Sequence, residues 1–435
     1  MAHLRNFSAT ARVALAVLLV PILAPQAGCG KEEEAAAPPG HEAAAPQAAA
    51  PADPARGLLV AISKFEMAGG KPKPLSELLM LREHAGAWQA TAVGDPESNV
   101  FHKAMVYQPP GEAPGILTLG GTAAVVKLWR AKAGTLQPVQ TLWKKDFGGQ
   151  FSRMRDGEVA DLYGDGRPDI IVATHDQGVV AIIRPQGEGR YAVQEIDHKK
   201  NTFVHEIEIG DLDQDGVPEV YATTSEPNRL DGKPQKGTVA RYVPARGEGR
   251  KVVADLGMRH AKEILVGDVD GDGVDELYVS IEAVEGGTLE IRRYDADTPP
   301  AAGFTIATLP DPMCRFLTAG DVDGDGKKEM VIAAKDSGLW LARPGPNPRD
   351  RWPLTQIDAH SKGFEHAALL TDLDGDGTDE LYVANDDAKE IDRYVWEGGK
   401  PRRETIYKRS SPLPVLTWNL MPVPVALLPE RSGLP

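Results

Sequence analysis

The sequence is poor in cysteine, in aromatic residues and in basic charge. It has 2 cysteines among 435 residues, so a disulfide framework or a zinc ribbon is excluded. With 63 acidic residues against 48 basic ones its formal net charge is -15, which excludes a nucleic-acid binder acting through bulk charge because phosphate binding requires a basic surface. No apolar run long enough to span a membrane follows the first 30 residues, which excludes a polytopic membrane protein.

Glycine and proline are abundant, with 45 and 35 residues. Both residues mark turns and interrupt long helices, so their abundance predicts many short strands joined by turns. The chain is also long enough to bury a sizeable core. An all-β fold is therefore expected.

The first 28 residues have the features of a signal peptide. They contain Arg5 and Arg12, no acidic residue, and an apolar stretch over 13–24 that is too short to span a bilayer. The segment Ala27-Gly28-Cys29 resembles the lipobox of bacterial lipoproteins, although Gln26 stands where that family usually has an aliphatic residue. The resemblance implies cleavage before Cys29 and acylation of its thiol. Ordinary secretion with a free or buried Cys29 is the alternative.

Residues 29–56 are predicted to be the lipidated cysteine followed by a disordered Ala/Pro linker. Between Gly30 and Arg56, 11 of 27 residues are alanine and 5 are proline, so the segment has too little apolar surface to fold. Neither Gly30 nor Lys31 is the aspartate that retains many enterobacterial lipoproteins at the inner membrane. The resemblance therefore implies a bacterial envelope protein whose lipid anchor lies in the outer membrane more readily than in the inner one.

The rest of the chain, residues 57–435, repeats one motif. Segments beginning at Val159, Ile209, Val266, Ala319 and Leu370 align, and the first aspartates of their acidic loops are 50, 57, 53 and 51 residues apart. A period near 50 residues accommodates four short strands and their turns. Each unit is therefore predicted to be a four-stranded antiparallel sheet. A radial arrangement of the units is favoured over stacking as a solenoid.

Two further units follow the strand pattern without the acidic loop. One runs from Phe101 to Trp143. The other is split between the chain ends: residues 415–425 supply an inner strand, and residues 58–65, 75–82 and 88–93 supply three more. Pairing both ends in one sheet removes exposed sheet edges. The sequence thus predicts a seven-bladed β-propeller of four-stranded antiparallel sheets, whose last blade is closed by the N- and C-terminal strands.

The acidic loops share the spacing D-x-D-x-D-G-x-x-[D/E]. Carboxylates at positions 1, 3 and 5 turn toward one centre, glycine at position 6 permits a sharp reversal, and the acid at position 9 returns from the next strand. Such oxygen ligands suit Ca²⁺, and we expect four to five ions. The candidate metal ligands are Asp161, Asp165, Asp169, Asp211, Asp213, Asp215, Glu219, Asp268, Asp270, Asp272, Glu276, Asp321, Asp323, Asp325, Glu329, Asp372, Asp374, Asp376 and Glu380.

The alternative interpretation of these loops is that aspartate and glycine merely form good turns. Like charges at about 4 Å cost on the order of 1 to 4 kcal/mol per pair when nothing neutralises them, so a cation is expected in the loops. In the first loop Tyr163 replaces the second acid. We expect that loop to bind metal weakly or to stay empty.

At these residues the sequence resembles FG-GAP/VCBS repeats, the calcium-binding β-propeller repeats that also occur in integrin α-subunits. The resemblance covers roughly residues 57–435 and rests on the five copies of the loop motif. It implies a seven-bladed propeller with calcium loops on one face and ligands on the opposite face. It does not imply a single function, because such propellers serve as adhesion modules, as scaffolds and as frames of polysaccharide-degrading enzymes.

Motifs of several enzyme classes are missing. The sequence has no G-x-S-x-G elbow, no H-E-x-x-H zinc helix and no phosphate-binding glycine loop. We therefore expect a monomeric, calcium-stabilised binding or scaffold module, whose partner is a glycan, a small anionic ligand or an envelope protein. A lyase-type, polysaccharide-degrading enzyme is the alternative, because a site assembled across blades leaves no local motif.

A pattern of an apolar residue, any residue and a basic residue precedes most of the predicted inner strands. One position in radially arranged strands forms a ring, and the acidic loops at the far strand ends place this ring on the opposite face. We predict that the ring holds an anionic or hydroxyl-rich ligand; the alternative is that its bases only pair with Glu206, Glu263 and Glu365. The predicted ligand-binding residues are Lys103, Arg153, His205, Lys262, Arg315 and His366, and the seventh blade offers Trp418 and Asn419.

Overall fold

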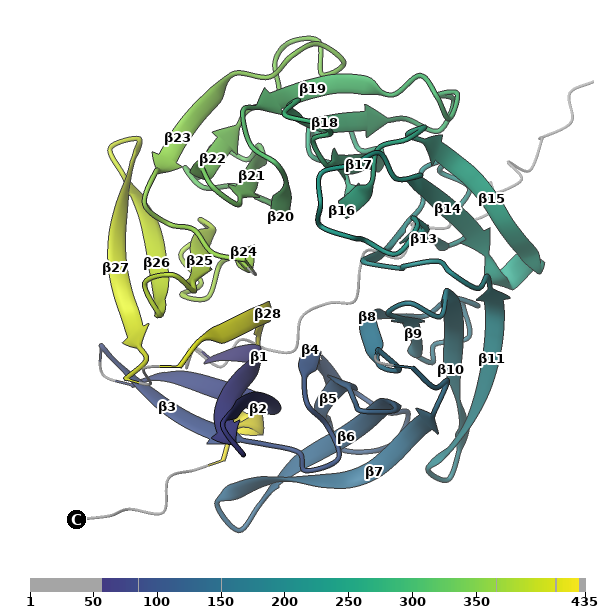
Figure 1. The fold of residues 1–435 in the computed structure, drawn as a ribbon, viewed down its shortest axis with the longest axis vertical. Helices are drawn as coiled ribbons and strands as arrows, with labels where there is room; N and C mark the ends of the chain where they lie inside the picture. The colour runs from purple at the N-terminus through teal and green to yellow at the C-terminus, as the bar shows by residue number, and fades with distance from the viewer. Residues whose placement is uncertain (1–56, 85, 150, 365, 411–412, 430–435) are drawn as a thin grey trace, which may run out of the picture. The chain divides into compact units, whose positions relative to one another are not determined.

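The computed structural model describes residues 57–429, apart from residues 85, 150, 365 and 411–412. Within these ranges the chain forms seven four-stranded antiparallel sheets arranged radially around one axis (Figure 1). The predicted all-β, seven-bladed propeller is confirmed, and the solenoid alternative is wrong. The predicted signal peptide, Cys29 and the linker over 29–56 lie outside the described residues.

Each sheet has one strand at the axis and one at the periphery. The innermost strands are β4 (Phe101–Tyr107), β8 (Met154–Ala160), β12 (Ile207–Gly210), β16 (Ala261–Gly267), β20 (Cys314–Gly320), β24 (Ala368–Thr371) and β28 (Val415–Pro422). The second strands are β5 (Gly115–Gly120), β9 (Asp169–Thr174), β13 (Glu219–Thr223), β17 (Glu276–Ile281), β21 (Glu329–Ala334), β25 (Glu380–Asn385) and β1 (Gly57–Ala68).

The outer half of each sheet is built in the same order. The third strands are β6 (Ala124–Lys132), β10 (Val179–Gly187), β14 (Thr238–Val243), β18 (Leu289–Tyr294), β22 (Gly338–Ala342), β26 (Glu390–Glu397) and β2 (Lys71–His84). The outermost strands are β7 (Thr135–Lys145), β11 (Arg190–His198), β15 (Glu248–Asp255), β19 (Phe304–Leu309), β23 (Leu354–Asp358), β27 (Lys400–Lys408) and β3 (Ala87–Val93). Two short 3-10 helices, η1 (Pro244–Arg246) and η2 (Val425–Leu427), complete the described elements, and no helix in the described ranges has the length and apolar character of a membrane span.

The core lies between the sheets. Among the described residues there are seven apolar clusters, one for each pair of neighbouring sheets. The second strands, such as β17 and β21, are buried along their whole length because both of their faces pack against a neighbouring sheet. Their unbroken apolar runs suit this environment. Peripheral strands such as β11 are largely exposed, which explains their polar composition.

The chain ends meet in one sheet, as predicted. Strand β28 pairs with β1 in antiparallel register from Leu58–Pro422 to Lys64–Val415. The strand ends at Pro422 and not at residue 425 as expected, because the prolines here lack the donors that a ladder requires. Asp386 of the adjacent sheet fastens β28 by accepting hydrogen bonds from the backbone N–H and the hydroxyl of Thr417, at 2.6 and 2.7 Å.

Candidate functional site

The inner strands carry polar residues at both of their ends. Each strand begins at what we call the mouth end and finishes at what we call the loop end, where an acidic loop follows in five of the sheets; β8, for example, runs directly into Asp161. At about 3.3 Å per residue the two ends of such a strand are roughly 20 Å apart. The mouth end and the loop end are therefore separate candidate sites.

A β-bulge marks the mouth end of five inner strands. The pairing of β4, β8, β16, β20 and β28 with their neighbours shifts there and leaves an additional residue outside the ladder. A bulge re-aims side chains. Strands β12 and β24 begin just after the equivalent position. We call the residues at this position the bulge ring: His102, Arg155, His205, Lys262, Arg315, His366 and Trp418.

Two of the six predicted ligand-binding residues are out of register with the bulge ring. Counting back six residues from the first aspartate of the loop gives Arg155, whereas the prediction was Arg153. Arg153 precedes β8, and its guanidinium lies over the rings of Phe151 and Trp418 at 4.8 and 5.9 Å. Lys103 occupies the next position along β4. The apolar-x-basic period missed this register because the bulge inserts a residue that a regular strand does not have.

Charged residues from sheets that are not neighbours influence one another across the axis. Lys103 forms ion pairs with Glu158 and with Asp156, the latter at 3.1 Å, in the next sheet. Burial opposes the charge of Lys103, but these carboxylates and the more distant Glu206 and Glu208 outweigh it and hold the pKa of Lys103 well above its usual value. Since Glu206 and Glu208 belong to the sheet of β12, two sheets away, these groups converge near the axis.

His205 links the bulge ring to these carboxylates. Its Nε2 accepts a hydrogen bond from Arg155 at 2.5 Å, and its Nδ1 lies 3.0 Å from Oε1 of Glu263. Burial lowers the pKa of His205 well below its usual value, and Arg155 adds to this effect. The ligand atoms of His205, Glu206 and Glu263 lie within 4.8 Å of one another, as in a metal centre. Because protein groups face both nitrogens of this neutral imidazole, we assign the trio to the polar network and not to a metal.

Burial separates the charged from the neutral members of this network. It lowers the pKa of His102 well below its usual value and that of His366 to about 4, so these imidazoles are neutral near pH 7. It raises the pKa of Glu263 to about 8, against the opposing effect of the neighbouring cations. The cationic members of the bulge ring are Arg155, Lys262 and Arg315.

Most of the predicted ligand-binding side chains are buried against protein groups. All six except Arg153 are more than nine-tenths buried. Lys262 Nζ lies 4.0 Å from a carboxylate oxygen of Glu282, and the Arg315 guanidinium lies 4.6 Å from the ring centroid of Phe364. Neither contact is one of the pairs that the structural alternative named, which were with Glu206, Glu263 and Glu365; Glu263 lies beside His205, and Glu365 lies outside the described residues. Any ligand must therefore meet the partly exposed residues first.

An aromatic rim lies beside the bulge ring at the mouth end; we define it as Phe151, His175, Phe203 and Trp418. The ring centroids of His175 lie 4.9 Å from Phe151 and 4.5 Å from Phe203, and those of His102 and Trp418 are 4.5 Å apart. Phe151 and Trp418 are partly exposed, as is Arg153. The rim thus offers aromatic surface and a guanidinium to solvent.

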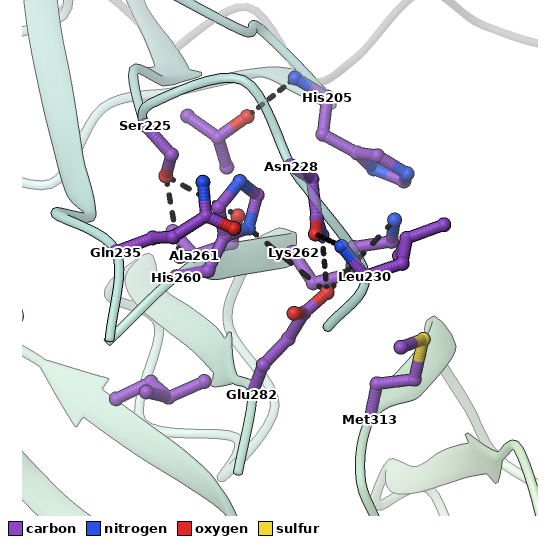
Figure 2. A network of polar contacts seen from close by, with 12 residues as sticks. His205, Ser225, Asn228, Leu230, Gln235, His260, Ala261, Lys262, Glu282 and Met313 are labelled. Atoms are coloured by element: carbon purple, nitrogen blue, oxygen red, sulfur yellow. Dashed lines mark hydrogen bonds and ion pairs between the residues drawn. The ribbon is translucent and has the colours of Figure 1, made fainter. Parts of the chain in front are cut away.

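The loop between β13 and β14 reaches the same end (Figure 2). Asn228 donates a hydrogen bond to Glu282 at 2.8 Å, and the backbone N–H of Glu285 donates to Gly232 at 3.0 Å. His260 is hydrogen-bonded to the carbonyl of Glu226 at 3.0 Å. The loop is therefore fixed to the neighbouring sheet. No motif in the sequence marks this loop, although the length of the segment between the two strands could have revealed it.

At the loop end, four of the acidic loops bring carboxylates together. In each of them oxygen atoms of three carboxylates lie within 4.8 Å of one another. The first aspartate accepts backbone hydrogen bonds from its own loop; Asp268, for example, accepts one from Gly273 at 3.0 Å. Gly273 has φ 87°, a conformation that favours glycine. The clustered residues are Asp211, Asp213 and Asp215; Asp268, Asp270 and Glu276; Asp321, Asp323 and Asp325; and Asp372, Asp374 and Glu380. These all-oxygen sets fit a hard divalent cation.

The Asp161 loop, all of whose residues are described, lacks such a group. Tyr163 stands at its third position, and the guanidinium of Arg184 lies 3.8 Å from the centroid of that ring. Burial raises the pKa of the closing acid, Asp169, to about 6. The expectation that this loop binds metal weakly or not at all stays a prediction, and the absence of a carboxylate cluster is in line with it.

Comparison with known proteins supports the repeat and the fold. Residues 161–222 match the FG-GAP-like repeat family, and no curated protein sequence matches the chain. Candidate 6-phosphogluconolactonases from Bacteroides fragilis and Bacteroides uniformis are 14% and 13% identical, with TM-scores of 0.51 and 0.52; the alignments cover 86% and 85% of this chain and all of theirs. The Dos1 propeller is 8% identical over 77% of this chain and 82% of its own, with a TM-score of 0.51. At such low identity these structures share the fold alone. The chain therefore carries an FG-GAP-like repeat within a seven-bladed β-propeller.

Proposed function

We propose that this protein is a calcium-stabilised binding module that takes a small anionic ligand at the mouth end of its propeller. The observation that carries the proposal is that Arg155, Lys262 and Arg315, from three sheets, all lie close enough to lower the pKa of Glu263, next to an aromatic rim whose Trp418 and Phe151 are partly exposed. Arg155 lies 5.3 Å from the centroid of Trp418, so cationic and aromatic surfaces are contiguous.

The chemistry of the mouth end favours a ligand with both a negative charge and a ring. Guanidinium groups pair with planar carboxylates and phosphates through two parallel hydrogen bonds. Partly exposed aromatic faces such as Trp418 and Phe151 pack against flat apolar surfaces, including the faces of sugar rings. An acidic sugar, free or at the end of a glycan, satisfies both requirements, and a protein partner would present a carboxylate without the ring.

Calcium supplies structure in this proposal. The four carboxylate groups named above would hold the ions, each between an inner strand and the second strand of one sheet. Binding to the folded state alone adds to stability by mass action. The ions would also offset part of the chain's net charge of -15. The loop end thereby fixes the inner strands that carry the mouth end.

Titration calorimetry tests ligand binding. The mature chain carrying Cys29→Ser would be titrated with glucuronate, with glucose as the neutral control, in calcium and in chelator. We expect saturable binding of glucuronate that Arg153→Ala and Trp418→Ala abolish. Equal binding of glucose would remove the anion requirement, absence of any binding would leave the scaffold role, and cleavage of an acidic polysaccharide would establish the enzyme instead.

Membrane anchoring through Cys29 is part of the proposal and is tested separately. A buried acyl chain contributes about 0.8 kcal/mol per CH₂, and lipoproteins carry several chains. The unmutated protein should therefore fractionate with membranes, more with the outer than with the inner, and Cys29→Ser should release it. Recovery of the unmutated protein in the soluble periplasmic fraction would contradict the anchor and leave ligand binding untouched.

A further inference from the structure

An arginine faces every one of the five acidic loops. It comes from the third strand of the same sheet, or from the residue just after it, and in each case it approaches the acid at position 9 and the residue at position 3. The sequence spacing from the first aspartate varies between 21 and 30 residues, so no local motif reveals it. The arginines are Arg184, Arg241, Arg293, Arg343 and Arg393.

Arg293 has the most complete set of contacts. Its guanidinium pairs with Asp270 at position 3, with Glu276 at position 9 at 2.9 Å, and with Asp295 at 2.6 Å. Its side chain is 5% exposed, so the pairs are shielded from solvent. The loop therefore holds a positive charge of its own beside two of the carboxylates that belong to its candidate metal group.

The other loops repeat this contact with different strength. Arg343 lies 2.9 Å from Asp323 and 2.5 Å from Glu329, and its side chain is 38% exposed. In the Asp161 loop Arg184 lies 2.7 Å from Asp165 and against the ring of Tyr163. In this loop position 3 is Tyr163 in place of an acid, so it offers only an aromatic face to the guanidinium of Arg184.

We infer that these arginines are built-in counter-ions, which compensate the loop carboxylates without metal and weaken calcium binding by holding the acids at positions 3 and 9. The inference rests on the proposed calcium loops and concerns the arginines alone. A guanidinium and a divalent cation draw on the oxygens of the same two carboxylates, and their like charges repel each other at this range. Four carboxylates with one arginine carry a net charge of -3, which is weaker attraction for Ca²⁺ than the acids alone provide. In the Asp161 loop, Arg184 takes the place of metal altogether.

Arg293→Gln tests the inference, with Arg292→Gln as the matched control. Arg292 lies on the same strand and pairs with Glu290, away from the loop. In the mature Cys29→Ser chain, Arg293→Gln should lower the melting temperature in chelator and tighten one calcium site by about tenfold in calorimetry, because a neighbouring positive charge is gone. The rise in melting temperature on adding calcium should therefore be larger than in the unmutated chain. Arg292→Gln should leave the calcium affinity unchanged.

Arg184→Gln extends the test to the loop that lacks a carboxylate cluster. It should lower the melting temperature equally in chelator and in calcium. Should Arg293→Gln fail to fold, Arg343→Gln replaces it, because that side chain is more exposed. Unchanged or weaker calcium binding in Arg293→Gln, or in Arg343→Gln where that variant is used, would overturn the inference, since an arginine that only positions a ligand would weaken binding when lost. If calcium changes the melting temperature of Arg293→Gln but not that of the unmutated chain, the counter-ion role is supported and the proposed calcium loops are contradicted. If calcium changes neither melting temperature, both proposals are contradicted.

Discussion

The two ends of the inner strands differ in how strictly they repeat. At the loop end four loops carry aspartates at positions 1, 3 and 5, a glutamate at position 9 and an arginine from the third strand or from the residue just after it. At the mouth end the seven positions of the bulge ring hold histidine, arginine, lysine or tryptophan. Identical residues in equivalent places indicate a task that every sheet shares. Residues that vary around one axis indicate a surface on which each sheet has its own task.

The same contrast appears in burial and charge. The aspartates at positions 1, 3 and 5 of the loops are partly or fully exposed, and an arginine of the same sheet compensates part of the charge of each loop. The charges at the mouth end are buried and act between sheets, as the pair of Lys103 with Asp156 demonstrates. Adjoining loops do touch, since the backbone N–H of Asp321 donates to Asp379 of the next sheet at 2.8 Å, but their charges are compensated within one sheet, whereas a change of charge at the mouth end acts on several sheets.

Deleting the chain from Val415 onward should have the largest effect. It removes β28 and the residues after it, and with them one member of the bulge ring and several members of two apolar clusters. The loss should exceed the whole stability of a typical domain, about 5 to 15 kcal/mol. Size-exclusion chromatography should find aggregate in place of monomer. A soluble monomer with an unchanged melting curve would mean that the ends do not close the ring.

Removal of calcium should have the next largest effect and should act only on the loop end. A site saturated at 100 times its Kd contributes about 2.7 kcal/mol, so several sites together matter. We expect chelator to lower the melting temperature and calcium to restore it. Magnesium serves as the control, since irregular carboxylate loops suit the larger ion. Melting curves that coincide in chelator and calcium would show that the loops are turns held by their arginines.

Glu263 provides a pH test of the mouth end. Burial raises its pKa in the folded protein to about 8, above the usual value near 4.5, while Arg155, Arg315 and Lys262 oppose the shift and Glu206 and His205 lie beside it. The protonated Glu263 contributes stability that is fully present below pH 4.5 and is lost as pH rises toward 8, because between these values the folded chain holds a proton that the unfolded chain has released. The free energy of unfolding should therefore fall by on the order of 1 kcal/mol per pH unit in this range. Glu263→Gln should flatten this slope in urea unfolding curves. If the pH dependence of the free energy of unfolding is unchanged in Glu263→Gln, a group other than Glu263 takes up the proton.

Arg153→Ala should have the smallest effect on stability and a complete effect on ligand binding. Its guanidinium is partly exposed and stacks on Phe151, so the loss should amount to about 0 to 1 kcal/mol. Arg190→Ala, on the outer strand β11, is the control for general loss of positive charge. Loss of glucuronate affinity in the first variant alone would locate the site. A marked drop in stability of Arg153→Ala would place this residue with the buried structural bases instead.

The sequence analysis predicted the sheets and the acidic loops well because both rest on contiguous patterns. A loop motif of nine residues with glycine at its turn is visible without any knowledge of the fold. The register of the bulge ring was harder, since a bulge adds a residue whose presence depends on the partner strand. Arg155 could have been found by counting back from Asp161, but His102 and Trp418 lie in sheets that have no acidic loop to count from.

The arginines at the loops could not be predicted for a different reason. Arg293 reaches Asp270 across two strands of one sheet, and the intervening turn varies in length from sheet to sheet. The same limit applies to the buried charges at the axis. Lys103 and Glu206 are brought within range only by the curvature that closes seven sheets into a ring. Contacts of this kind are properties of the assembled fold.

The register of β1 against β28 also determines at which end of the propeller the described chain begins. Because Leu58 pairs with Pro422, the chain enters the propeller at the loop end, where a side chain at Gly57 would collide with the carbonyl oxygen of Val423 at 2.8 Å. Under the proposed lipid anchor, the propeller would be held through Gly57 and therefore by its loop end. The bulge ring and the aromatic rim would then lie at the end opposite the attachment. Under the same proposal, solutes would reach them without passing between the propeller and the membrane.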